Sequence, residues 1–177
     1  MQKIIIEEVI SKNLTGVKQE IALDFVAYIR ALGLKINVID VNKKAHHFTI
    51  ENNGVAFFRV YINNSFSVSP FPGVSCSWFY SSANESDVKF PVPVVDDQIK
   101  KLVWKKVKRC LNCGCKFAPG RKETILGKEF DNVCVSPPIQ FCNISNPVHL
   151  VCIKQMVTAM KNDIFAEKFI FTEENQS

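Results

Sequence analysis

Six of the seven cysteines lie in the last 68 residues of this 177-residue chain, and their spacing is suited to metal or thiol chemistry. The run Cys110-X-X-Cys113-Gly114 has the form of a zinc knuckle, because the glycine allows a tight turn that points backbone amides at the thiolates. Zinc takes four ligands in a tetrahedral arrangement, and a gap of about twenty residues between the two halves is ordinary for ribbon-type sites. We therefore predict a zinc site formed by Cys110, Cys113, Cys134 and Cys142.

Two other interpretations of the cysteines stay open. Thiols without a metal fit nearly as well, since Cys134 and Cys142 do not form a second Cys-X-X-Cys. A metal- or thiol-dependent enzyme acting through Cys113 or Cys115 is the alternative of a different class. The Cys110-X-X-Cys113 pair follows a predicted helix, however, and the dipole at the end of a helix opposes thiolate formation. This position argues against a thioredoxin-type role.

Basic residues gather in the same part of the chain. Between Asp96 and Lys128 there are ten Lys or Arg and three Asp or Glu, whereas the whole chain has a formal charge of +5. One interpretation is a nucleic-acid-binding module that uses a basic helix over 97–109. We favour a solvated helix face, because Lys outnumbers Arg and no groove-reading or phosphate-loop motif is present. The residues predicted to bind an anion are Lys101, Lys105, Lys108, Arg109, Arg121 and Lys122.

The elements that must position these residues follow from the hydrophobic pattern. Apolar residues recur at helical spacing over 16–32, and Gly33 stands where a helix commonly ends. Alternating residues predict antiparallel strands over 34–39, 46–51, 55–62 and 66–69, and a further strand over 76–80. Asn53-Gly54 is a strong hairpin signal between the second and third strands.

The third strand suggests a binding surface. Phe57, Arg59 and Tyr61 point to one side of the sheet, whereas the residues between them point to the other. We predict a ligand pocket on the concave side of the sheet, with Arg59, Tyr61 and Trp78 as its polar and aromatic groups.

The second half of the chain is less regular. A helix is expected from Asp96 or Asp97, followed by a cysteine-rich segment over 110–142 that contains several glycines and prolines. Asn146-Pro147 begins a last helix, predicted over 147–162, because asparagine caps a helix and proline suits its first position. We expect one domain over 1–167 and a tail over 168–177.

The order of these parts resembles the YdhG-like family of small bacterial α+β proteins. The likeness covers roughly residues 16–108 and rests on the early helix, the hairpin at Asn53-Gly54, and Lys89-Phe90-Pro91 leading into the helix from Asp97. Some members of that family are described as frataxin-like iron chaperones, which would call for surface carboxylates. This chain has no clear acidic ridge, so the resemblance implies the fold and says little about function.

The sequence also indicates a compartment and a class of function. The first residues lack the pattern of a secretory signal, and no apolar run reaches the ~18 residues that a membrane span needs. We expect a cytoplasmic protein without membrane contact, in which thiols stay reduced.

The predicted fold is α+β, with an N-terminal helix on an antiparallel meander. The predicted function is that of a non-enzymatic binding or adaptor protein for a small molecule or protein, with zinc as its possible metal.

Overall fold

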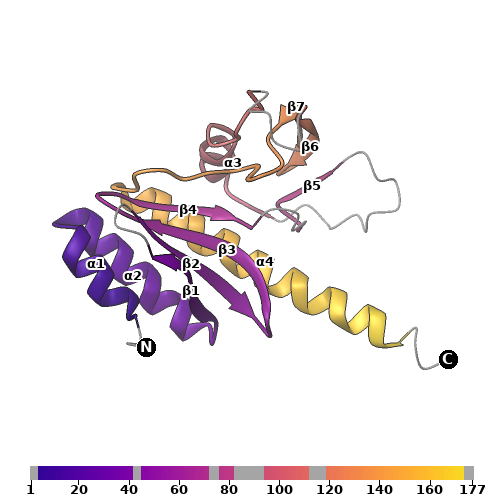
Figure 1. The fold of residues 1–177 in the computed structure, drawn as a ribbon. Coiled ribbons are helices and arrows are strands. Elements are labelled where there is room, and N and C mark those ends of the chain that lie inside the picture. Colours follow the sequence, from indigo (N-terminus) through magenta and orange to yellow (C-terminus); the bar gives the residue numbers. More distant parts are fainter. Residues whose placement is uncertain (1–3, 42–44, 72–75, 82–93, 112–118, 174–177) are drawn as a thin grey trace.

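The computed structural model describes residues 4–41, 45–71, 76–81, 94–111 and 119–173, and it has the predicted α+β fold (Figure 1). The helices are α1 (Ile6–Asn13), α2 (Val17–Ala31), α3 (Asp97–Trp104) and α4 (Pro147–Glu173). The strands are β1 (Lys35–Val41), β2 (His46–Asn52), β3 (Val55–Ile62), β4 (Phe66–Pro70), β5 (Phe79–Ser81), β6 (Arg121–Ile125) and β7 (Lys128–Val133).

The first four strands form an antiparallel sheet in chain order, as the alternation predicts. Asn53 and Gly54 join β2 to β3 with φ angles of 49° and 81°, which asparagine and glycine adopt more readily than other residues. The segment around Phe141 runs along the outer edge of β4, where Val68 and Phe141 exchange two backbone hydrogen bonds of 2.9 and 3.0 Å. This segment covers one edge of the sheet.

The main core lies between the sheet and three helices. Figure 1 shows α1 and α2 side by side next to the sheet, and α4 as a long helix that extends past it. Phe58, Val60 and Ile62 of β3 are 1% exposed or less. Phe25 of α2 packs on Phe66 of β4, which is the direct partner of Ile62, with ring centroids 5.7 Å apart. These even-numbered residues of β3 therefore face the helices.

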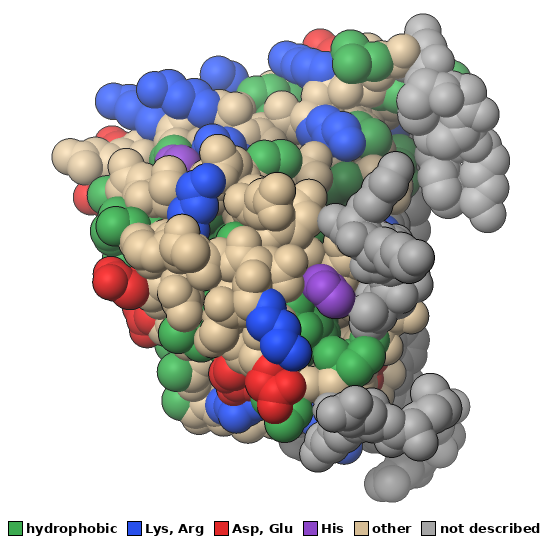
Figure 2. Space-filling model, turned by 60° about the vertical axis from the view of Figure 1, so that its left-hand side comes forward, with side chains coloured by type: hydrophobic (Ala, Val, Ile, Leu, Met, Phe, Trp, Pro, Cys, Tyr) green, Lys and Arg blue, Asp and Glu red, His purple; other side chains and the backbone are tan. Residues whose placement is uncertain are grey.

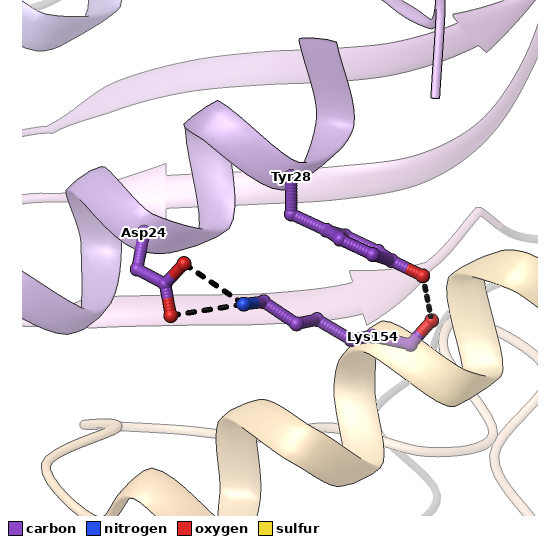
Figure 3. A network of polar contacts seen from close by, with 3 residues as sticks. All are labelled: Asp24, Tyr28 and Lys154. Carbon is purple, nitrogen blue, oxygen red and sulfur yellow. Dashed lines mark hydrogen bonds and ion pairs between the residues drawn. The ribbon is translucent and has the colours of Figure 1, made fainter. Parts of the chain in front are cut away.

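Polar side chains join α2 to α4 (Figure 3). The Tyr28 hydroxyl donates to the carbonyl of Lys154 at 3.1 Å and also contacts the hydroxyl of Thr158. The Lys154 ammonium lies 2.8 and 2.9 Å from the two carboxylate oxygens of Asp24. We call Asp24, Tyr28, Lys154 and Thr158 the helix seam. Each of its side chains has a hydrogen-bond partner across or along the two helices.

A second sheet, in the order β5-β6-β7, lies beside α3. Its first strand overlaps the strand expected over 76–80, whereas β6 and β7 lie within the segment expected to be an irregular cysteine-rich loop. Leu126 and Gly127 turn between β6 and β7 with φ angles of 47° and 78°. This hairpin was not predicted, because leucine rarely adopts a positive φ. The Trp104 indole donates to the Ile125 carbonyl at 2.8 Å and thereby attaches α3 to β6.

Two predicted helix boundaries were wrong. The helix expected over 97–109 ends at Trp104, because Val107 and Arg109 pair with Ile139 and Val133 as extended chain. The last helix continues to Glu173 rather than ending near residue 162, so it reaches into the predicted tail. In addition, α1 was not expected. Within the described part of the chain, no helix combines the length and apolar character needed to cross a bilayer.

Candidate functional site: a polar patch on the sheet

The face of the sheet opposite the helices carries two rows of polar side chains. Arg59 of β3 lies directly opposite Thr49 of β2 and Ser69 of β4. Residues paired in this way, and residues two apart along a strand, share a face of the sheet. Tyr61 begins the second row, opposite His47 and Ser67. We call these six residues the sheet patch: His47, Thr49, Arg59, Tyr61, Ser67 and Ser69.

Arg59 is the only patch residue with a permanent charge. It is half-buried, and its guanidinium carbon lies 4.3 Å from the centre of the Phe71 ring. Its Nε atom is covered from solvent and has no hydrogen-bond partner among the described residues, which also supply no carboxylate to form an ion pair with it. Buried polar groups in folded proteins are normally hydrogen-bonded. The structure therefore holds an arginine whose hydrogen-bonding capacity is unused.

Ser69 is the second patch residue with an unused polar atom. It is fully buried, and its Oγ finds no partner in the described part of the chain. The other two small hydroxyls are satisfied. Thr49 donates to Oε1 of Glu51 at 3.1 Å, and the Oγ of Ser67 accepts from the backbone N–H of Asn143 at 3.1 Å. The unused donors thus belong to one row of the patch, that of Arg59.

His47 and Tyr61 form the neighbouring row. Their rings meet edge to face with centroids 4.9 Å apart, and both residues are half-buried. No hydrogen bond joins the two side chains, and His47 has no carboxylate partner among the described residues. Nucleophilic catalysis needs a nucleophile within hydrogen-bond reach of its base. Within the described residues, the contact between the two rings is what joins this row.

Trp78, the third residue predicted for the ligand pocket, lies elsewhere. It is 1% exposed and lines a hollow of about 500 Å³ between α4 and residues 94–96. Tyr28 and Lys154 of the helix seam also line this hollow, whereas Arg59 and Tyr61 do not. The structure places Arg59 and Tyr61 in one patch, and Trp78 apart from them.

The predicted metal ligands are only partly within the described residues. Cys110 and Cys134 are buried, Cys142 is exposed, and Cys113 lies outside the described residues, as does Cys115. Backbone hydrogen bonds of 2.8 Å on either side of the Arg109–Val133 pair place Cys110 and Cys134 on the same side of this ladder. Among residues with a described placement, no group of three or more His, Cys, Asp or Glu side chains could hold a metal ion.

Gly120 follows the chain segment that contains Cys113. A Cβ atom added to this glycine would lie 2.6 Å from the Cβ of Cys110 and 2.6 Å from the Val133 carbonyl oxygen. Only glycine fits between two such close neighbours. Gly120 is therefore packed closely against Cys110 and Val133.

Cys152 of α4 is chemically inert. Burial raises the pKa of Cys152 to about 12, so its thiol stays protonated at neutral pH. Burial and the nearby Lys106 lower the pKa of His149, whose ring packs on Phe141 with centroids 6.0 Å apart. Both residues act as packing groups in the structure.

The six predicted anion-binding residues fall into two groups. Three have partners: Arg109 donates to the Asp131 carbonyl, Arg121 pairs with Glu123, and Lys122 pairs with Glu129 at 2.8 Å. Lys101, Lys105 and Lys108 are exposed and have no partner in the described ranges. Figure 2 shows basic side chains gathered along the upper edge of the molecule, the part that α3, β6 and β7 occupy in Figure 1. Half of the set is thus engaged in local pairing.

Arg59 and Tyr61 were predicted from the sequence, whereas the four patch residues on the neighbouring strands were not. The alternation His47-X-Thr49 and Ser67-X-Ser69 carries the signal, since it matches Arg59-X-Tyr61 in spacing. Bringing the three strands into register also requires the irregularity between Ile50 and Glu51. That shift is not evident from the residue types.

Comparisons with known proteins add no further constraint on the site. No family model matches the chain, and the searches of curated proteins and of solved structures found no significant match. The resemblance to the YdhG-like family therefore stays a prediction. The function is inferred from the geometry of the sheet patch.

Proposed function

We propose that the protein is a non-enzymatic, cytoplasmic binding protein that takes a small polar molecule on the sheet patch. The observation that carries this proposal is Arg59, a half-buried arginine that has no hydrogen-bond or ion-pair partner among the described residues. An unpaired polar group costs about 1–3 kcal/mol when it is buried, so stability alone does not favour an arginine here. A ligand would satisfy it.

Ligand-observed NMR on a mixture of sugars, amino acids, amines, carboxylates and phosphate esters tests this proposal. We expect saturation transfer from the wild type to at least one compound, and loss of that transfer in Arg59→Met. Lys12→Gln is the matched control, because it also removes one positive charge but lies on the exposed surface of α1. No transfer to any compound, or equal transfer in Arg59→Met, would contradict the proposal.

A structural zinc site is the second element of the proposal. Cys110 and Cys134 share one side of a backbone ladder, and Cys113 and Cys115 lie between them in sequence. Zinc held there would pin the segment over 110–134 and take no part in ligand binding. Elemental analysis of the purified protein tests it, with Cys113→Ser as the control. About one zinc per chain that is lost in Cys113→Ser supports the site, and less than about one-tenth contradicts it.

A further inference from the structure

We infer that the ligand of the sheet patch carries an oxyanion, a carboxylate or a phosphate, and that Arg59 binds it through its terminal guanidinium nitrogens. This inference rests on the proposed function and names the chemical class of its ligand. It begins with the charge of the patch. Arg59 is its one permanent charge, and the nearby carboxylate of Glu51 accepts from Thr49 instead of pairing with Arg59. The positive charge is uncompensated within the described residues.

The arginine is also held in a definite orientation. Its guanidinium lies over the Phe71 ring at 4.3 Å, while Nε is covered from solvent. The residue as a whole keeps some exposed surface, and Nε contributes none of it. The edge formed by Nη1 and Nη2 is therefore the edge available to a ligand. Two parallel N–H groups match two oxygens of a carboxylate or phosphate, which is the geometry that makes arginine preferable to lysine at such sites.

The row of Arg59 has more donors than acceptors. Arg59 offers five N–H groups and accepts none, and Ser69 offers a hydroxyl with no partner in the described ranges. The one carboxylate described near this row, that of Glu51, already accepts from Thr49. A ligand group rich in acceptors complements such a row, whereas an amine or other donor group would add to the surplus. His47 and Tyr61 in the neighbouring row then contact the uncharged remainder of the ligand.

The basic residues compared here differ from Arg59, because each of them is either paired or exposed to water. Arg109, Arg121 and Arg30 each have a described partner, namely the Asp131 carbonyl, Glu123 and Glu7. Lys101, Lys105 and Lys108 are unpaired in the described ranges, but they are exposed, so water solvates them at no cost. Arg59 alone among the described arginines is both half-buried and unpaired.

Titration with inorganic phosphate, and separately with acetate, tests the inference on the full chain. The readout is the side-chain Nε–Hε signal of Arg59 in a nitrogen-correlated NMR spectrum, assigned by its disappearance in Arg59→Lys. We expect a saturable shift of this signal and of the amide signals of Thr49 and Ser69. Affinity should fall by about tenfold or more in Arg59→Met and by a smaller factor in Arg59→Lys, which keeps the charge but not the planar fork.

Sodium chloride at matched ionic strength and the Lys12→Gln variant are the controls. A shift that sodium chloride reproduces, or an affinity unchanged in Arg59→Met, would overturn the inference. A larger effect of phosphate than acetate would indicate a phosphate ligand, and the reverse a carboxylate. The inference can also fail while the proposed function stands. If neutral or cationic compounds shift the patch amides while both anions leave the Arg59 signal unmoved, the patch binds a ligand but not an oxyanion.

Discussion

The helix seam and the sheet patch both contain polar side chains that are partly or fully buried, but these side chains differ in whether they have hydrogen-bond partners. In the seam, the Tyr28 hydroxyl and the Lys154 ammonium each have partners at hydrogen-bond distance. In the patch, Arg59 Nε and Ser69 Oγ have none within the described residues. A satisfied polar group holds two elements together, whereas an unsatisfied one makes the fold less stable. The seam therefore joins the two helices, and the patch is the surface at which we propose that a ligand binds.

The largest effect is expected from the seam. Tyr28→Phe removes a hydroxyl that bonds to Lys154 and Thr158, so the free energy of unfolding should fall by about 1–2 kcal/mol. Tyr61→Phe is the matched control, since no described group bonds to the Tyr61 hydroxyl, and it should change stability by less than about 0.5 kcal/mol. Urea denaturation measures both. Equal losses in the two variants would break the comparison.

Arg59→Met should act in the opposite direction. The change removes a covered, unpaired N–H group, whose burial destabilises the fold by about 1–3 kcal/mol. It also removes a cation–π contact with Phe71, which stabilises the fold by about 0.5–1 kcal/mol. The net expectation is a gain of about 1 kcal/mol in the free energy of unfolding, because methionine keeps an apolar stem against Phe71. A loss of stability on urea denaturation would show that Arg59 supports the fold.

A serine pair gives a finer version of the same test. Ser69→Ala removes a buried hydroxyl without a described partner and should stabilise the protein by about 0.5–1 kcal/mol. Ser77→Ala removes a buried hydroxyl that donates to Asp163 at 2.8 Å and should destabilise it by about 1 kcal/mol. Thermal unfolding of the two variants compares them directly. The same sign for both would refute the distinction between used and unused hydroxyls.

His149 lies outside both regions, and its titration also changes the free energy of unfolding. Measuring the free energy of unfolding as a function of pH separates this effect from the differences above. Burial, with a smaller effect of Lys106, lowers the pKa of His149 in the folded protein, so folding favours the neutral ring. Its contribution to stability is therefore complete above the ordinary histidine pKa of about 6.5 and is lost as the pH falls below it. His149→Gln should flatten the acid side of the stability profile. The variants above are best compared above pH 7, and an unchanged acid slope in His149→Gln would contradict this assignment.

Much of the fold around the sheet could be predicted, because local rules and tertiary structure agree there. The pattern over 16–32 gives α2, and Asn53-Gly54 gives the hairpin. The rules failed where pairing with distant residues decides the conformation. Val107 and Arg109 continue a helical pattern but are extended, since they pair with Ile139 and Val133. The turn at Leu126-Gly127 lacks the usual asparagine and was missed for that reason.

The candidate site could be predicted only along one strand. Alternation places Arg59 and Tyr61 on the same face, and the structure agrees. Their partners depend on how β2 and β4 align with β3, and the irregularity after Ile50 makes that register invisible in the residue types. The unpaired state of Arg59 depends on three-dimensional distances. The sequence offers many acidic residues and does not tell which of them reach it.

The most direct test of the account is the stability of wild type and Arg59→Met, each with and without inorganic phosphate, by urea denaturation. In plain buffer we expect the variant to be the more stable protein. Phosphate at ten times its Kd should raise the free energy of unfolding of the wild type by about 1.4 kcal/mol, and should affect the variant no more than sodium chloride does. A variant that is less stable in buffer, and that phosphate stabilises as much as the wild type, would contradict the claim that Arg59 is kept for binding.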